Sequence, residues 1–269
     1  MATFSDRYGP WAVVAGASNG IGLGFAHQFA ARGVNIVLVS RRTEALTDAA
    51  RAVEARSGVT TRVCTADLTA PDVVERVRDA TDDIDVGAIV YNAGAVHGAG
   101  VFHERPVDEA VFLVDLNCRG PVLLAHHFAP RFVARGAGAI VFMSSMAAMA
   151  GSAYVAAYSA TKAFDINFAE GLALELRPHG VDAMAVVAGA TRTPALLASG
   201  ARVDESVFPL MDPEEVARGA LDALGTTPLW IAGAGNQQSY EAMRALPRAE
   251  VSALMSQGSA FLYDLPDLA

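Results

Sequence analysis

The chain contains a tyrosine and a lysine four residues apart, Tyr158-Ser-Ala-Thr-Lys162, with a serine, Ser145, thirteen positions before the tyrosine. On a helix, residues four apart lie on one face, so the heads of Tyr158 and Lys162 can enter the same site. A phenol is a weak acid with an ordinary pKa near ~10, and a nearby ammonium favours the phenolate and lowers that pKa. The pair therefore predicts a general acid or base that exchanges a proton with a carbonyl oxygen, which the Ser145 hydroxyl could also hold.

The N-terminal part of the chain has the pattern of a nucleotide-binding unit. An apolar run at 11–15 is typical of a strand buried on both faces, and Gly16-Ala-Ser-Asn-Gly20-Ile-Gly22 follows it directly. A helix is predicted at 23–32, before Gly33, and a second strand at 35–39. Glycines at such a turn let backbone amides approach a pyrophosphate, which the positive end of the helix attracts. Because the spacing differs from the general G-x-G-x-x-G motif, the prediction of a dinucleotide site depends on the strand and helix around it.

Together these motifs resemble those of the short-chain dehydrogenase/reductase family in its single-domain form, and the resemblance runs from about residue 9 to residue 230. The resemblance identifies Asn117, Ser145, Tyr158 and Lys162 as a candidate catalytic tetrad. It also implies a cofactor site formed by the glycine turn, the end of the second strand and four later segments. The expected cofactor-binding residues are Gly16, Ser18, Asn19, Gly20, Ile21, Gly22, Ser40, Arg41, Arg42, Asp67, Leu68, Asn92, Ala93, Gly94, Tyr158, Lys162, Gly189, Thr191 and Thr193.

The resemblance further implies a role for each member of the tetrad. Tyr158 would exchange the proton with the substrate oxygen, and Ser145 would orient that oxygen. Lys162 would lower the pKa of the phenol and contact the nicotinamide ribose, and Asn117 would hold a water that links Lys162 to solvent. The spacing to the tyrosine selects Ser145 over its neighbour Ser144, which is expected to pack or cap.

Three positions depart from the family pattern. Ala15 replaces the usual threonine before the first glycine, Tyr91 replaces the first asparagine of Asn-Asn-Ala-Gly, and Ala188 replaces the proline before Gly189. These changes bear on cofactor affinity and stability more than on chemistry. Enoyl reductases of the same superfamily carry a tyrosine where this chain has Ala156, so reduction of carbon–carbon double bonds is disfavoured.

The residues after the second strand predict the cofactor NADP(H). An acidic residue at that strand end would accept hydrogen bonds from the ribose of NAD, whereas arginine suits a 2′-phosphate. The chain has Ser40-Arg41-Arg42 there, and the planar guanidinium fork matches a phosphate group well. The alternative is that both arginines simply begin an exposed helix, in which case NAD could serve.

Alternating strand and helix patterns predict an α/β fold, a single Rossmann-type domain with a doubly wound parallel sheet of about seven strands and helices on both faces. The whole chain, 1–269, is expected to form this domain, with a core at about 9–232 and a C-terminal extension at 236–269. Further strands are predicted at 61–65, 88–91, 139–143, 183–187 and 229–232, and further helices at 44–56, 71–81, 107–134, 153–176 and 213–224.

Composition excludes several classes of function. A formal charge of −9 disfavours a nucleic-acid partner, which needs a basic surface. No apolar run is long enough for a membrane span, and the N-terminal residues lack a secretion signal. Two cysteines, Cys64 and Cys118, fit a reducing cytoplasm and read best as small buried hydrophobes. No group of histidines, cysteines and carboxylates has metal-ligand spacing, so no catalytic metal is expected.

The substrate is predicted only by class. The segment 194–211 would cover the substrate in this family and is largely apolar, and Ala147, Met149 and Tyr154 would add to the wall. A fairly apolar ketone or secondary alcohol is therefore expected, with His97 as a pocket residue or a loop surface residue. The same apolar residues could instead form a contact between subunits of a homodimer or homotetramer. The extension 236–269 could be helical and lie over the pocket, or could belong to such an interface.

Two other functions remain open from the sequence. The chain could be an NAD-linked alcohol dehydrogenase of the same family. It could also bind NADP(H) as a sensor without catalysis, although such proteins typically lack the tyrosine or the lysine.

Overall fold

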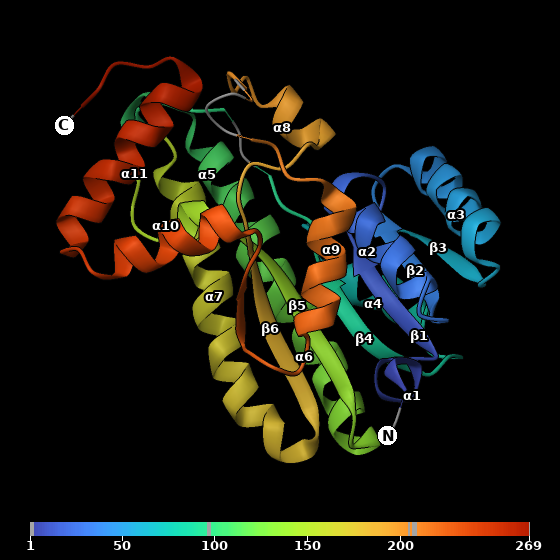
Figure 1. Ribbon diagram of the computed structural model, residues 1–269. Coiled ribbons are helices and arrows are strands. Elements are labelled where there is room, and N and C mark those ends of the chain that lie inside the picture. The colour runs from blue at the N-terminus through green and yellow to red at the C-terminus, as the bar shows by residue number, and fades with distance from the viewer. Residues whose placement is uncertain (1–2, 96–97, 204, 206–208, 269) are drawn as a thin grey trace.

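The computed structural model describes residues 3–95, 98–203, 205 and 209–268, so His97 and part of the segment 194–211 lie outside the described residues. Its centre is a parallel sheet of seven strands in the order β3-β2-β1-β4-β5-β6-β7 (Figure 1). The predicted doubly wound α/β fold is confirmed. The strands are β1 (Trp11–Ala15), β2 (Asn35–Ser40), β3 (Thr61–Thr65), β4 (Val86–Tyr91), β5 (Gly138–Ser145), β6 (Val181–Ala188) and β7 (Leu229–Ile231).

The central strands are apolar throughout because both of their faces are covered. Every residue of β4 is buried, and the pairing of Ala12 with Ile36 on one side and with Ala88 on the other places β1 between β2 and β4. The strand order reverses between β1 and β4. This reversal opens a crevice at the carboxyl ends of these strands, where ligands of such sheets bind.

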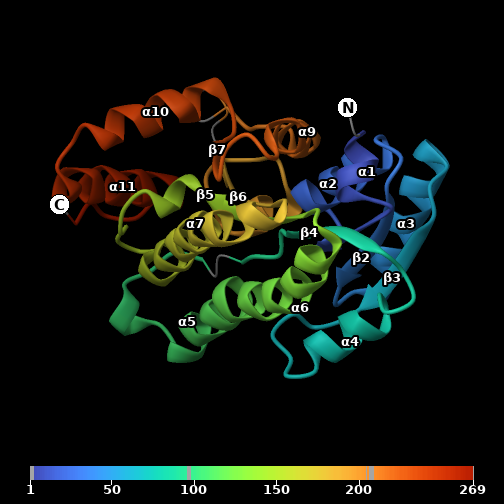
Figure 2. The ribbon, with the colours of Figure 1, turned by 90° about the horizontal axis from the view of Figure 1, so that it is seen from below.

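Helices cover both faces of the sheet, as the view from below shows (Figure 2). One core, which includes Phe25 and Phe29, lies between the sheet and helices α1 (Phe4–Tyr8), α2 (Gly20–Ala30), α3 (Thr43–Ser57) and α9 (Pro213–Ala223). The other, which includes Phe128 and Phe132, lies between the sheet and helices α4 (Val73–Asp79), α6 (Gly120–Arg135) and α7 (Ala156–Leu176).

The single long helix predicted at 107–134 is wrong in one respect. The structure has α5 (Val107–Val114), a π-helical segment η2 (Asp115–Arg119) and then α6. A π segment carries an extra residue in its turn and changes the direction of the side chains that follow. The Tyr91 hydroxyl donates a hydrogen bond of 2.7 Å to the Leu116 carbonyl of this segment, and Gly120 leaves room for the Tyr91 ring. Tyr91, which stands where the family pattern has asparagine, therefore stabilises the π-helical segment η2.

Helix α7 begins at Ala156, three residues later than the predicted start at 153. Tyr154 has a φ of 67°, which a helix cannot accommodate. The loop before α7 is held by tertiary hydrogen bonds instead. The Ser152 hydroxyl donates to the Met255 carbonyl at 3.0 Å, and the Ala153 amide donates to the Ser256 hydroxyl at 2.9 Å.

The extension at 236–269 is largely helical and forms α10 (Ala234–Arg244) and α11 (Arg248–Tyr263), which lie beside the carboxyl edge of β5 and β6 (Figure 1). The shorter helices are α8 (Pro194–Ala198), η1 (Phe102–Glu104), η3 (Met146–Ala148) and η4 (Arg177–His179). In the part of the chain that the structure describes, no helix is both long and apolar enough to cross a membrane.

Candidate active site

The carboxyl ends of the strands open onto a cavity of about 930 Å³. Residues at or after the ends of β1 to β6 line it on the side of the sheet, and α5, η2, η3, α7, α8, α10 and α11 contribute further walls. The volume is large enough for a dinucleotide end and a second molecule beside it, since typical ligand pockets measure roughly 300–1,000 Å³.

Ser145 and Tyr158 both face this cavity. Ser145 is the last residue of β5, and its hydroxyl accepts a hydrogen bond of 3.2 Å from the Ala147 amide. A hydroxyl that accepts in this way keeps its own proton to donate. Tyr158 lies in the first turn of α7 and is half-buried. The adjacent Ser144 is buried and donates to the Lys162 carbonyl at 2.7 Å, so it packs β5 against α7 as expected.

Lys162 extends from α7 to the floor of the same cavity. Its Nζ donates to the Met143 carbonyl at 2.7 Å and to Asp165 Oδ2 at 3.0 Å. Burial on its own would lower the pKa of this ammonium, but the Asp165 carboxylate and the nearby Tyr158 raise it above its ordinary value. Gly94 makes room for the ammonium, because a Cβ at that position would lie 3.3 Å from Nζ.

Asn117 lies in η2 and is fully buried beneath the site. Its Nδ2 donates to Thr161 Oγ1 at 3.0 Å, and its Oδ1 accepts from the Ala95 amide at 3.4 Å. Asn117 therefore ties the loop after β4 to α7. It does not line the cavity itself, and its role in holding a water stays a prediction.

The glycine turn is packed so closely that its glycines have no room for a Cβ atom. Gly16 has a φ of 85°, and a Cβ there would lie 2.7 Å from the Ala93 amide nitrogen. A Cβ on Gly22 would overlap the Gly16 carbonyl, and a Cβ on Gly20 would lie 2.9 Å from Thr193 Cγ2. The turn therefore brings the first-turn amides of α2, which have no partners within the helix, close to the cavity. Asn92 Nδ2 donates to the Gly16 carbonyl at 3.0 Å and braces the turn that lacks the usual threonine.

Two arginines stand at the far end of the cavity. Arg41 and Arg42 line it and are exposed, and Arg42 Nη2 donates to the Ser18 hydroxyl at 3.4 Å. Asp67 lies nearby and accepts from the Thr69 amide at 2.9 Å. Burial acts to raise the pKa of Asp67, but the Thr69 hydrogen bonds and the charge of Arg41 outweigh it and lower the pKa. In the described part of the chain, no carboxylate forms an ion pair with either arginine.

The sequence profile of short chain dehydrogenases matches residues 10–203, which contain the glycine turn and all four residues of the predicted tetrad. The chain belongs to the short chain dehydrogenase family. It is therefore an oxidoreductase of the kind that uses a nicotinamide cofactor and acts on alcohol or ketone groups.

Relatives of this short chain dehydrogenase match over nearly their whole length. A 7beta-hydroxysteroid dehydrogenase of Clostridium sardiniense is 33% identical over 254 residues, covering 94% of this chain and 97% of the relative. A solved structure of a 7beta-hydroxysteroid dehydrogenase superposes with a TM-score of 0.87 at 31% identity, over 94% of this chain and 99% of that one. A short-chain dehydrogenase from Sphingobium yanoikuyae in complex with NADPH gives a TM-score of 0.78 at 32% identity, over 90% and 95% of the two chains.

The structure brings the predicted site residues of this dehydrogenase together. Every predicted cofactor-binding residue except Gly22 lines the large cavity, as do Ser145, Tyr158 and Lys162 of the tetrad. Gly22 serves the packing of the turn. Among residues 3–95, 98–203, 205 and 209–268, no three histidine, cysteine or carboxylate side chains are grouped as metal ligands.

The C-terminal helices supply lining residues that the sequence did not single out. These side chains are mostly apolar or aromatic and come from both α10 and α11: Asn236, Ser239, Met243, Leu254, Met255, Ser259, Leu262 and Tyr263. Only the general expectation of a helical extension over the pocket pointed to them. A single sequence carries no signal for which face of these helices meets the site.

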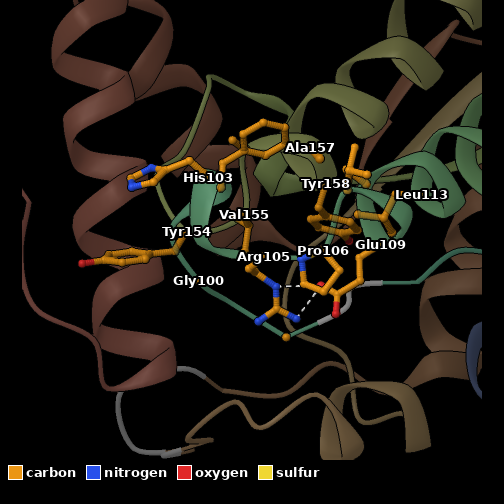
Figure 3. Close-up of a pocket in the computed structure, with 15 residues that line it drawn as sticks. Gly100, His103, Arg105, Pro106, Glu109, Leu113, Tyr154, Val155, Ala157 and Tyr158 are labelled. Atoms are coloured by element: carbon orange, nitrogen blue, oxygen red, sulfur yellow. Dashed lines mark hydrogen bonds and ion pairs between the residues drawn. The ribbon is translucent and has the colours of Figure 1, made fainter.

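Two of the three side chains predicted to extend the substrate wall lie elsewhere. Ala147 lines the large cavity, as predicted, but Met149 does not. Tyr154 lines a second cavity of about 230 Å³, between α5, the loop before it and the start of α7. In Figure 3, Tyr154 points away from Tyr158, and its hydroxyl donates to the Pro266 carbonyl beyond α11. The left-handed backbone at Tyr154 is what turns its side chain in this direction.

Tyr158 and Val155 line both cavities and so form the partition between them. Arg105 and Glu109 pair across the smaller cavity, with Nε of Arg105 2.7 Å from Glu109 Oε2 (Figure 3). His103 is exposed at its edge. The two opposite charges of the smaller cavity are thus paired with each other.

Proposed function

We propose that this chain is an NADP(H)-dependent dehydrogenase that interconverts a ketone and a secondary alcohol on a bulky, apolar molecule of steroid size. The observation that carries the proposal is the large cavity, which joins the Ser145, Tyr158 and Lys162 groups to an apolar wall built by the C-terminal helices. The cofactor end of the cavity and the apolar end meet at Tyr158.

The described residues fit a dinucleotide. Gly16, Gly20 and Gly22 pack so closely that the backbone amides at the start of α2 face the cavity, and such amides bind a pyrophosphate. Arg41 and Arg42 would hold the 2′-phosphate of NADP, and Asp67 with Leu68 would flank the adenine. Lys162, Asn92 and the loop from Gly189 to Thr193 would hold the nicotinamide end. When bound, this cofactor would exchange a hydride with the substrate carbon.

The chain's own groups would manage the proton and the developing charge. Ser145 would donate a hydrogen bond to the substrate oxygen, since its hydroxyl proton is not needed for the bond from Ala147. Tyr158 would give that oxygen its proton in reduction and remove it in oxidation. The Lys162 ammonium would stabilise negative charge on the phenol. Donors that are already in place where charge develops contribute a large part of catalysis.

The substrate class follows from the walls and the relatives together. Met243, Met255 and Leu262 face the cavity from α10 and α11, and Leu196 faces it from α8. A neutral ring system would lose little by leaving water for such a surface, whereas a sugar phosphate would find no second cluster of cations among the described residues that line it. The match to 7beta-hydroxysteroid dehydrogenases supports a hydroxysteroid or a related bulky ketone.

The test is a titration of the purified protein with NADPH and with NADH, followed by turnover assays at ~340 nm. The panel contains 7-oxosteroids with the matching 7β-alcohols, 3-oxoacyl thioesters and small acyclic ketones. Consumption of NADPH with the bulky ketones and not with acetone is the expected result. NADPH binding without turnover of any ketone or alcohol would favour a cofactor sensor, and preference for NADH would favour the NAD-linked alternative.

Replacing Arg41 with aspartate should move the cofactor preference towards NADH. The change removes a phosphate partner and places a carboxylate beside the 2′ position, so the affinity for NADPH should fall about 10- to 100-fold while NADH binding is kept. Fluorescence titration with both cofactors measures the effect. Arg51→Asp is the matched control, because Arg51 is exposed on α3 and does not line the cavity. An unchanged ratio of the two affinities in Arg41→Asp would remove Arg41 from the phosphate site.

The proposal also extends to assembly and location. We expect a cytoplasmic location, because the two cysteines, Cys64 and Cys118, are free thiols that fit a reducing compartment. We also expect a homodimer or homotetramer, because α5 exposes Val107, Val111 and Val114 and α7 exposes Leu174. Apolar patches on soluble proteins often mark contact surfaces. Sedimentation analysis of the purified protein decides the oligomeric state.

A further inference from the structure

Lys162 is the only lysine in the chain, and the other 19 basic residues of its Lys and Arg total of 20 are arginine. Position 162 therefore carries an ammonium group, whereas the arginines elsewhere in the chain carry guanidinium groups. Space is one reason, because Nζ lies against Gly94 with little room for a larger head group. An ammonium is also a compact cation whose pKa responds to its surroundings, unlike that of arginine.

The ammonium has a buried counter-ion. Asp165 lies three residues after Lys162, on the same face of α7, with Oδ2 at 3.0 Å from Nζ. The Lys162 and Asp165 side chains are 6% and 3% exposed. Because an ammonium has three donors and the Met143 carbonyl and Asp165 take two of them, one N–H remains to serve the cavity that Lys162 lines.

The other titratable groups that face Asp165 cannot replace Lys162 as its partner. Tyr91 on β4 approaches from one side, but its hydroxyl already donates to the Leu116 carbonyl. Cys118 in η2 approaches from another, and burial together with the Asp165 charge raises the pKa of this thiol to about 11, so it is neutral near pH 7. In the described part of the chain, Lys162 is the one cation that contacts the Asp165 carboxylate.

We infer that Asp165 is a positioning residue of the active site, which keeps the buried Lys162 ammonium charged and fixes its direction so that one N–H faces the cofactor ribose. A buried ammonium without a counter-ion loses its proton readily. The use of the remaining N–H rests on the proposed function, whereas the charge pairing does not. None of the four family tetrad positions includes this carboxylate.

The electrostatics of the pair agree with this geometry. Burial raises the pKa of Asp165 to about 6, against the opposing effect of Lys162, so the carboxyl is ionised at neutral pH and gains a proton below about pH 6. The pKa of Lys162 is shifted upward despite its burial. Both members of the pair are therefore charged at neutral pH.

The single lysine makes a direct test possible. Protein grown with lysine carrying ¹³C at Cε gives one labelled side-chain signal, whose chemical shift reports the charge on Nζ and on its neighbour. In the unaltered protein we expect a small inflection near pH 6, from Asp165, and a charged Nζ throughout the neutral range. A Lys162 signal that shows a neutral amine at pH 7 would overturn the pairing, and this measurement needs no variant.

The variant Asp165→Asn keeps the shape and a hydrogen-bond acceptor but removes the charge. The inflection near pH 6 should vanish, and the pKa of Lys162 should fall, because the carboxylate that raises it is gone. As the pH rises from 7 to 9, NADPH binding should weaken about tenfold in Asp165→Asn and stay level in the unaltered protein. Asp182→Asn is the matched control, because Asp182 pairs with Arg7 and Tyr8 away from the cavity.

The outcomes separate this inference from the proposed function. An unchanged Lys162 pKa in Asp165→Asn shows that the residue only packs, and overturns the inference. A lowered pKa in a protein that neither binds NADPH nor turns over a ketone upholds the pairing and refutes the proposed function. A lowered pKa together with pH-dependent loss of NADPH binding upholds both.

Discussion

Replacement of Tyr158 by phenylalanine should lower kcat by about 10³-fold while leaving the affinity for NADPH unchanged. The substitution removes the hydroxyl that, in the proposed function, exchanges a proton with the substrate oxygen. The phenyl ring stays in place, so the partition between the two cavities is kept. Single-turnover assays with a ketosteroid measure the rate, and fluorescence titration measures cofactor binding.

The matched control for this prediction is Tyr8→Phe. Tyr8 is buried at the opposite end of the sheet, where its hydroxyl donates to Asp182 at 2.7 Å, and its loss removes one buried hydrogen bond without touching the cavity. Tyr8→Phe should lower the free energy of unfolding by about 1 kcal/mol and keep full activity. Turnover by Tyr158→Phe within tenfold of the unaltered protein would show that another group handles the proton.

The regular part of the fold could be predicted because its signals are local. Apart from the edge strand β3, the strands coincide with largely apolar runs of the sequence, since a strand covered on both faces must be apolar along its length. The glycine turn could be located because a φ such as the 85° of Gly16 is strained for residues with a Cβ, whereas glycine adopts it at low cost. Tyr158 and Lys162 line the same cavity because they lie one turn apart on one helix.

The remaining features depend on contacts between distant segments, which a local pattern does not encode. The π-helical turn at 115–119 is stabilised by the Tyr91 hydroxyl on β4, and the late start of α7 by serines of α11. In the sequence, Asp165 cannot be distinguished from other polar residues of a helix. Its pairing with Lys162 becomes evident only in the folded protein, where Asp165 is buried beside the lysine.

The wall formed by α11 can be tested by filling the cavity from that side. Gly258 lies in the middle of α11 and lines the cavity, and a Cβ placed on it meets no atom within 4 Å. A leucine there should therefore be tolerated by the helix and should project into the space that the substrate would use. We expect kcat/KM for a ketosteroid to fall about 100-fold in Gly258→Leu, chiefly through KM, because the substrate must be displaced or distorted.

The same variant separates the substrate wall from the cofactor site. NADPH affinity and turnover of a small ketone should stay close to those of the unaltered protein, because the glycine turn, Arg41 and Tyr158 are on other elements. Gly235→Leu on α10 is the control, since a Cβ there also meets no atom within 4 Å but the position does not line the cavity. Equal loss with large and small ketones would mean that the leucine disturbs the catalytic groups. No loss with either would place the substrate away from α11 and withdraw the steroid-sized pocket as the basis of the proposed function.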